Sequence, residues 1–336
     1  MVLCVQNHLP QLNKITAFIK KNISLADNSI WAPEAYANLI AEAAKHLTYI
    51  ETVNNPDMPN ADSLHYHIEN KTQEDILHTN FLEMARKQLN RLKGKEITLI
   101  LDVTHEPFYG SINSNPELIH EYKPEKGCSG SFKFLVALVE ADNQRYFLDA
   151  VPLPLIYSLK GEAGEMLGRI RGFGMKIKVV LLDREFGRSS EIIDLLNRSG
   201  LKYLSMYPDY VNVKEIVKTV ESYARMPFEV RGVKTSLVVI RDKDYDWKLV
   251  TNLRFRDFAN YVKTYKKRWN IETGFRVTDE ARIKTKSVDI RVRYFLFLAA
   301  LILYNIWYLL SKPMSFKRFV MKFWDIVEDI IAIRVT

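Results

Sequence analysis

The spacing of apolar residues divides the chain into two parts with different patterns. Through about residue 93, apolar residues recur every three or four positions, which is the period of a helix with one buried face. The pattern is clearest in three segments, at 11–23, 33–47 and 72–92. Pro33 stands where a helix can begin, and a run rich in Asn and Pro at 54–60 predicts a loop. We therefore expect residues 1–93 to form a small all-helical domain.

From Glu96 onward, stretches rich in Ile, Val, Leu and Phe predict strands that alternate with helices. Strands are expected at 96–104, 131–141, 145–153, 176–183 and 201–207. Helices are expected at 162–174, 189–200 and 213–224. Residues 227–251 return to a strand pattern before three closing helices near 257–281, 291–311 and 315–333. Asp142 and Asn143 predict a tight turn between the second and third strands. This order predicts a mixed α/β sheet with a β insertion ahead of the last helices.

One apolar stretch is long enough to raise the question of a membrane span. Residues 294–310 are nearly all apolar, and their number lies at the lower limit for crossing a bilayer. The stretch contains Asn305 and is flanked by Arg291, Arg293 and Lys312. A single interrupted stretch of this kind favours a buried core helix, so we expect no membrane span.

Composition and cysteine content narrow the class of protein. The 336 residues are 47% hydrophobic and 26% charged, which is ordinary for a globular protein of two or so folding units. Cys4 and Cys128 are too few for a disulfide framework or a four-ligand zinc site. The first residues show neither the basic start nor the continuous apolar stretch of a secretory signal. We therefore expect a cytoplasmic location.

Two aspartates at the ends of apolar strands are the first candidates for chemistry. Asp102 lies in ITLILDVT and Asp183 in KVVLLDREF. The carboxyl ends of strands in an α/β sheet open into the crevice where ligands bind, so both acids should meet at one edge. One such carboxylate alone could equally be a helix cap. Two carboxylates held close together repel one another unless a cation lies between them, and ligands that are all oxygen suit Mg²⁺ or Mn²⁺.

A third acid is expected if metal ions are to be held, and Glu272 is the candidate. It lies in YKKRWNIETGFR, a segment rich in basic and aromatic residues. Tyr265, Arg268 and Glu272 are spaced by three and four residues and so share one helix face. A surface ion pair between Arg268 and Glu272 would explain this spacing without any function. Three apolar residues are expected to bury the rest of the helix: Trp269, Ile271 and Phe275.

Together these residues resemble the DDE transposases of bacterial and archaeal insertion sequences. The resemblance rests on Asp102 in a D-x-T strand, Asp183 in L-L-D-R-E-F and Glu272 in Y-x2-R-x3-E. The acids are 81 and 89 residues apart, which suits the branch with a β insertion before the Glu. The resemblance covers roughly residues 96–310, and the stretch DVTHEPFYG resembles the archaeal members. It implies an RNase H-like catalytic core with the first Asp on the first strand, the second on the fourth, and the Glu on a late helix.

The resemblance also implies a chemistry. A transposase of this kind would cleave DNA at the ends of its element and join the freed 3′ hydroxyl to target DNA. Asp102, Asp183 and Glu272 would be both the catalytic residues and the ligands of Mg²⁺ or Mn²⁺. Tyr265 and Arg268 would hold the DNA backbone. The implied partners are double-stranded DNA, as terminal inverted repeats and as target, and a second copy of the chain in a homodimer on that DNA.

One position departs from the family's pattern. A Lys commonly follows the Glu by seven residues, and that place is taken here by Asp279. Arg276, Arg282 and Lys284 lie nearby and could contact the same phosphate. Two other hypotheses therefore stay open: a catalytically inactive or domesticated DNA-binding derivative, and a related structure-specific nuclease that cuts without joining.

The net charge of +8 is concentrated in one region. Between Arg254 and Arg293 there are twelve basic and five acidic residues, a surplus of seven. Aromatic residues are interleaved with these charges, as a surface that binds the DNA backbone requires. The residues expected to bind DNA are Tyr265, Lys266, Lys267, Arg268, Arg276, Arg282 and Lys284.

These patterns predict three parts. The helical domain at 1–93 would serve in DNA-end binding or dimerisation, and the catalytic domain would span 94–311 with the β insertion around 225–252. A C-terminal helix would follow at 312–336. His105 and Glu106 follow Asp102 closely and could assist it, whereas the other histidines have no partner at metal-ligand spacing.

Overall fold

The computed structural model describes residues 16–23, 30–243, 245–280, 282–310 and 314–322. At its centre is one eight-stranded sheet in the order β3-β2-β1-β4-β5-β8-β7-β6. The strands are β1 Glu96–Phe108, β2 Gly130–Ala141, β3 Gln144–Leu153, β4 Lys176–Leu182, β5 Tyr203–Met206, β6 Tyr223–Val230, β7 Val233–Arg241 and β8 Asp246–Thr251.

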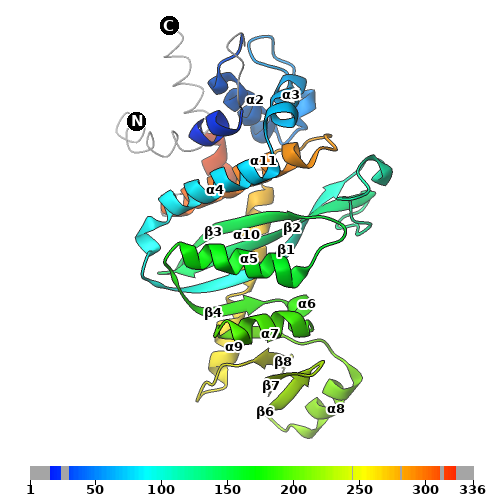
Figure 1. The fold of residues 1–336 in the computed structure, drawn as a ribbon, viewed down its shortest axis with the longest axis vertical. Helices are drawn as coiled ribbons and strands as arrows, with labels where there is room; N and C mark the ends of the chain where they lie inside the picture. Colours follow the sequence, from blue (N-terminus) through cyan, green and yellow to red (C-terminus); the bar gives the residue numbers. More distant parts are fainter. Residues whose placement is uncertain (1–15, 24–29, 244, 281, 311–313, 323–336) are drawn as a thin grey trace.

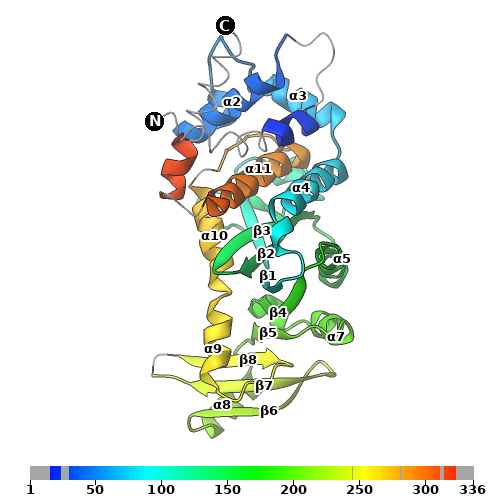
Figure 2. The same ribbon diagram turned by 90° about the vertical axis from the view of Figure 1, so that its left-hand side faces the viewer.

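Helices cover both faces of this sheet. The α-helices are α2 Pro33–His46, α3 Ala61–Lys71, α4 Glu74–Gln88, α5 Leu159–Gly172, α6 Arg184–Gly187, α7 Ser190–Arg198, α8 Val211–Thr219, α9 Ala259–Lys266, α10 Trp269–Asp279 and α11 Ile290–Leu309. Short 3₁₀ helices lie at η1 Ile50–Thr52, η2 Asn90–Leu92 and η3 Ile112–Ser114. Residues 16–22 and 316–322 are also helical. α5 and α7 lie on one side of the sheet, and α9 and α10 run along the other (Figures 1 and 2).

The first five strands have the order and directions of an RNase H-like sheet. β1 pairs antiparallel with β2, and β2 pairs antiparallel with β3. β1 pairs parallel with β4, and β4 pairs parallel with β5. Asp142 and Asn143 form the predicted turn between β2 and β3, both with positive φ, of 51° and 59°. The predicted fold class, a mixed α/β sheet with an RNase H-like core, is confirmed.

The β insertion extends this sheet and does not form a layer of its own. β8 pairs antiparallel with β5, and β7 and β6 continue outward from it. The helix predicted at 213–224 is too long, since α8 ends at Thr219 and Tyr223 begins β6 by pairing with Ile240 of β7. Strand pairing at the end of this segment overrides its helical apolar spacing.

The apolar stretch near the C-terminus is a core helix, as predicted. α11 is long and apolar enough to cross a membrane, but 83% of its most apolar window is buried inside the protein. Asn305 on this helix donates to the carbonyl of Phe147 at 2.7 Å and accepts from the Phe147 N–H at 2.8 Å. Because β3 is an edge strand, this amide satisfies backbone groups that no neighbouring strand reaches. The one polar residue that interrupts the stretch therefore fixes the helix against the sheet.

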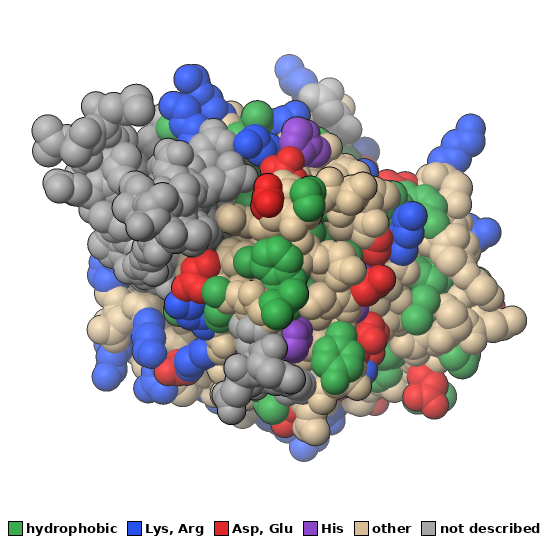
Figure 3. Space-filling model, turned by 90° about the horizontal axis from the view of Figure 1, so that it is seen from above, with side chains coloured by type: hydrophobic (Ala, Val, Ile, Leu, Met, Phe, Trp, Pro, Cys, Tyr) green, Lys and Arg blue, Asp and Glu red, His purple; other side chains and the backbone are tan. Residues whose placement is uncertain are grey.

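The N-terminal helices lie at the β3 edge of the sheet, where α4 packs along α11 (Figure 1). Their buried side chains, such as Tyr36 and Phe81, are continuous with those of the sheet. Seen from this end, the described surface shows acidic and apolar side chains near its centre and Lys and Arg toward its rim (Figure 3). The division into domains at residues 93 and 311 stays a prediction, and most of the predicted C-terminal helix at 312–336 lies outside the described residues.

Candidate active site

Neighbouring parallel strands bring Asp102 and Asp183 to the same edge of the sheet. Asp102 lies within β1, and Asp183 follows directly after the last residue of β4. Leu101 is level with Leu182 in the register of the two strands, so the aspartates that follow them are level too. The sequence-based expectation of two adjacent acids is met by this register.

Glu272 reaches the same place from the helix that crosses this face. α10 lies close against the sheet because Gly274 has no side chain, and a Cβ there would lie 2.9 Å from the ring of Phe147. Asp102, Asp183 and Glu272 all line one pocket of about 690 Å³. Their joint catalytic role stays a prediction, but the three candidates from distant parts of the chain do share a single cavity.

An aromatic wall forms part of this pocket. Tyr245 and Trp247 come from the β insertion, with ring centroids 5.0 Å apart, and Trp269 begins α10 with its ring 6.2 Å from Trp247. Trp269 is 45% exposed, so the expectation that it helps bury the helix is wrong. Its position at the first turn of α10 turns the indole toward the pocket and not toward the core.

Sequence reasoning missed Tyr245 and Trp247 as residues of the site. The signal available was their alternate spacing, which places both on one face of an extended segment. Nothing in the sequence showed that the insertion folds back beside the acids. The remaining residues of the pocket are Val103, Arg184, Met206 and Phe275, with Tyr265 and Arg268.

The pKa values of the two aspartates are shifted by their surroundings. Burial, followed by the nearby charge of Asp183, raises the pKa of Asp102 to about 7. Burial also raises the pKa of Asp183, against the hydrogen bond from the Phe186 N–H, which lowers it. That bond, at 3.1 Å, makes Asp183 the N-cap of α6. Asp183 therefore caps a helix and also lines the pocket, and its part in the chemistry stays a prediction.

Arg268 bridges two of the three acids. Its Nη1 lies 3.6 Å from Oδ2 of Asp102, and its Nη2 lies 2.5 Å from Oε1 of Glu272. The guanidinium also lies over the ring of Tyr265, 5.6 Å from its centroid. Burial acts to lower the pKa of Arg268, but these partners outweigh it and the pKa is raised. The ion pair of Arg268 with Glu272, which the sequence suggested as a surface contact, is thus one of two contacts by which the buried Arg268 joins β1 to α10.

The donors can be tested against the divalent ion that the sequence predicts. Among the residues that the structure describes, no group of three or more His, Cys, Asp or Glu is placed to hold a metal ion. The guanidinium of Arg268 lies between Asp102 and Glu272 instead. The donors are carboxylates alone, and burial and the charge of Asp183 raise the pKa of Asp102 although Arg268 acts to lower it. The residues therefore fit a hard divalent cation by their chemistry.

The residues predicted to bind DNA fall into two groups. Tyr265 and Arg268 line the pocket, and Lys266 lies beside it with Nζ 5.8 Å from the centre of the Trp247 ring. Lys267 instead bonds Glu140. The rest lie elsewhere: Arg276 is exposed on α10, and Arg282 and Lys284 line a separate pocket of about 110 Å³.

The weaker candidates have contacts outside the pocket. Nδ1 of His105 lies 3.0 Å from the hydroxyl of Ser131, and burial, with nearby positive charge, lowers the pKa of this histidine to about 4. Glu106 pairs with the buried Arg293 at 2.7 Å. Neither lines the pocket that holds the three acids.

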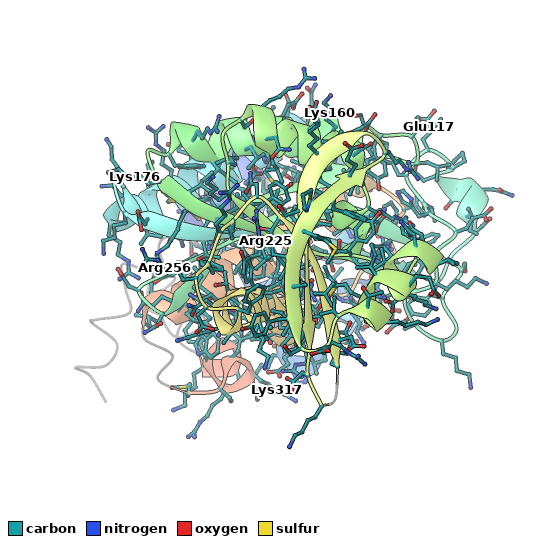
Figure 4. The ribbon with its side chains drawn as sticks, turned by 90° about the horizontal axis from the view of Figure 1, so that it is seen from below. Glu117, Lys160, Lys176, Arg225, Arg256 and Lys317 are labelled. Carbon is teal, nitrogen blue, oxygen red and sulfur yellow. The ribbon has the colours of Figure 1, made fainter. Side chains whose placement is uncertain are left out.

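Basic side chains are also spread over the far end of the molecule. Viewed from the end that carries the insertion, Arg225 lies near the centre, with Lys176 and Arg256 toward one side and Lys160 toward the other (Figure 4). Arg225 lies on β6 of the insertion, and the other three labelled basic residues lie apart from it in this view (Figure 4).

Comparison with known proteins shows which family part of the chain is similar to. Residues 161–306 match the family model of the transposase DDE domain, which includes Asp183 and Glu272. No curated protein matches the chain in sequence. Among solved structures, a piggyBac transposase synaptic complex with hairpin DNA aligns at a TM-score of 0.60 with 13% identity, over 99% of this chain and 81% of that one.

Two further structures align less closely. The NurA nuclease from Sulfolobus solfataricus has a TM-score of 0.31 and 7% identity, over 62% of this chain and 85% of its own. The Drosophila P element transposase strand transfer complex has a TM-score of 0.25 and 10% identity, over 68% and 53%. In sequence, residues 161–306 are thus similar to a transposase DDE domain, and in fold the chain is similar to the piggyBac transposase.

Proposed function

We propose that the protein is a metal-dependent DNA transposase that cleaves DNA at the ends of its element and joins the freed 3′ ends to target DNA. Asp102, Asp183 and Glu272 are its catalytic residues in this proposal. One observation carries it: the three acids, 81 and 89 residues apart, line a single pocket together with Arg268 and Tyr265.

The chemistry of the pocket residues supports this assignment. Bound Mg²⁺ or Mn²⁺, held by the three carboxylates, would supply a stabilising charge for the attacking and leaving oxygens of a phosphodiester. Asp102 and Asp183 are fixed by the sheet, whereas Glu272 is half-exposed on a helix. Arg268 can exchange a carboxylate for a phosphate, because its planar fork matches both. Tyr265, buried with its ring under the guanidinium, holds Arg268 at the pocket.

DNA is the partner that this surface suits. The piggyBac transposase whose fold is shared was solved with hairpin DNA. In this chain the segment from Arg254 to Arg293 carries seven surplus positive charges. It also contributes five of the residues that line the pocket: Tyr265, Arg268, Trp269, Glu272 and Phe275. We propose that double-stranded DNA, as element ends and as target, lies along α9 and α10, and that two copies of the chain hold two ends.

Asp279, which motivated the inactive alternative, does not line the pocket. It is the last residue of α10 and pairs with Arg282 at 3.6 Å. Its negative charge is therefore not one of those that crowd Asp102. This position supports an active enzyme over a derivative that only binds DNA.

The experiment is a cleavage and joining assay with terminal DNA of the element and Mg²⁺ or Mn²⁺. Asp102→Ala, Asp183→Ala and Glu272→Ala are each expected to abolish cleavage while the fold and DNA binding persist. Asp142→Asn, an exposed acid paired with Lys95, is the matched control and should cut normally. Three variants that cut like the parent would refute the site. Cleavage without joined products would indicate a nuclease, and a parent that binds without cutting would indicate an inactive derivative.

A further inference from the structure

A second set of polar contacts lies at the other side of the catalytic helix, outside the pocket. Glu140, near the end of β2, is only 8% exposed. Its Oε1 accepts from Nζ of Lys267 at 2.6 Å, and its Oε2 accepts from the side-chain amide of Asn270. We call these three residues, Glu140, Lys267 and Asn270, the junction clamp. Both of its donors come from the segment where α9 passes into α10.

The junction is a short stretch where the regular α-helical bonding of the layer is interrupted. α9 ends at Lys266 and α10 begins at Trp269, and neither helix has a side-chain cap at its start. The backbone continues through this break by hydrogen bonds that reach three residues back, and such a tightened stretch within a helical run often marks a hinge. The clamp joins this break to the sheet by a buried carboxylate with two donors.

The clamp connects the two elements that carry the catalytic acids. Lys267 immediately precedes Arg268, and Asn270 precedes Glu272 by two residues. On the sheet side, Glu140 is paired in register with Thr98 of β1, the strand that carries Asp102. The register of β1 with β2 therefore fixes Asp102 relative to Glu140, and the clamp fixes the segment that carries Glu272 relative to Glu140. Together they set the distance between Glu272 and Asp102.

We propose that Glu140 is a positioning residue, which fixes Arg268 and Glu272 relative to Asp102 through Lys267 and Asn270. The proposal rests on the proposed function of the pocket. It also pairs Lys267, whose side chain is 42% exposed, with a nearly buried carboxylate, although the basic segment around it was expected to contact DNA. Lys267 is the cationic partner of Glu140, a carboxylate that is almost fully buried. If Lys267 bound a phosphate instead, this buried carboxylate would lose its counterion.

The consequence of losing the clamp follows from the sensitivity of catalysis to position. Glu140→Gln keeps the volume and one hydrogen bond but removes the charge that holds Lys267. A shift of about 1 Å in reacting groups can cost roughly 100-fold in rate. We expect end cleavage at saturating DNA and Mg²⁺ to fall roughly 10- to 100-fold in this variant. DNA affinity and its salt dependence should stay unchanged, because no phosphate contact is removed.

The matched control is Asp142→Asn, which removes the same charge two residues further along but touches only Lys95. Asn270→Ala, a change that favours helix formation, removes one arm of the clamp and should give a smaller loss of rate. The exchanged pair Glu140→Lys with Lys267→Glu should recover much of the rate lost by Glu140→Gln. The rates are referred to the folded fraction of each variant, because a Glu140 that merely contributed to stability would not change the rate per folded molecule.

The proposal is overturned if Glu140→Gln cuts at the parental rate, or if the exchanged pair folds normally but does not recover the cleavage rate. It is also overturned if Lys267→Met lowers the salt slope of DNA binding by about one, as the loss of a phosphate contact would. Hydrogen exchange needs no catalysis and separates the two proposals. Faster exchange at residues 267–272 in Glu140→Gln, in a protein whose parent cuts no DNA, would keep the clamp and reject the proposed function. Unchanged exchange would reject the clamp.

Discussion

Replacing Asp102 by Asn should make the metal-free protein more stable, and more so as the pH rises. The carboxyl lies at the end of a buried run of β1, 8% exposed, with Asp183 beside it. Its pKa in the folded protein is about 7, against an ordinary value of 3.8. Asn has the same shape and can still accept the hydrogen bond that the Val103 N–H donates to Asp102 at 2.9 Å. The substitution therefore removes an ionisation that the fold opposes.

The size and sign follow from the shifted pKa. Below pH 4 the carboxyl is protonated in both states, so the two proteins should be equally stable. Between pH 4 and 7 the unfolded chain loses this proton while the folded one keeps it, so the parent loses about 1.4 kcal/mol per pH unit relative to the variant. Above pH 7 the gap should level off near 4 kcal/mol, the product of some three pKa units and that slope.

Urea unfolding of both proteins at several pH values between 4 and 8.5, with a chelator present, measures this gap. Asp142→Asn is the control, because the Lys95 ion pair lowers the pKa of Asp142 and its loss cannot stabilise the protein at high pH. Added Mg²⁺ should narrow the gap, since an ion that binds the parent's carboxylate stabilises only the folded parent. A gap that does not change with pH, or a parent more stable than the variant at pH 8, would refute the reasoning.

Two further predictions test the packing and the charge. Asn305→Ala should lower the free energy of unfolding by about 2–4 kcal/mol, because it leaves the buried N–H and C=O of Phe147 without partners. Urea unfolding measures this loss, and a loss below about 1 kcal/mol would contradict the prediction. Binding of end DNA should weaken steeply with added salt, and Lys266→Met should reduce the slope of log affinity against log salt by about one. A titration at several salt concentrations measures the slope, and a flat dependence would count against a phosphate surface along α9.

The sheet and the paired aspartates were accessible to sequence reasoning because both depend on local patterns. Apolar runs of strand length, each followed by Asp, required only that neighbouring strands be parallel for Asp102 and Asp183 to meet. Glu272 required more, since only the family's spacing connected it with acids far away in the chain. The aromatic wall could not be predicted, because the pairing of β8 with β5 is a non-local choice that no property of Tyr245 or Trp247 encodes.

Arg268 shows why the spacing of two charged residues in a sequence says little about how much their ion pair contributes to stability. The sequence offered an Arg and a Glu four residues apart, which on an exposed helix is worth only some tenths of a kcal/mol. In the structure the Arg268 side chain is buried to nine-tenths, and Asp102 contacts it from the sheet. Removing it would leave two acids without their counterion in a poorly hydrated pocket. If a divalent cation binds these acids as proposed, we expect Arg268 to give up at least one of them, because the cation replaces it as their counterion. Burial, which sequence spacing does not report, therefore makes Arg268 a counterion shared by the sheet and the helix, and not merely one half of an exposed helix pair.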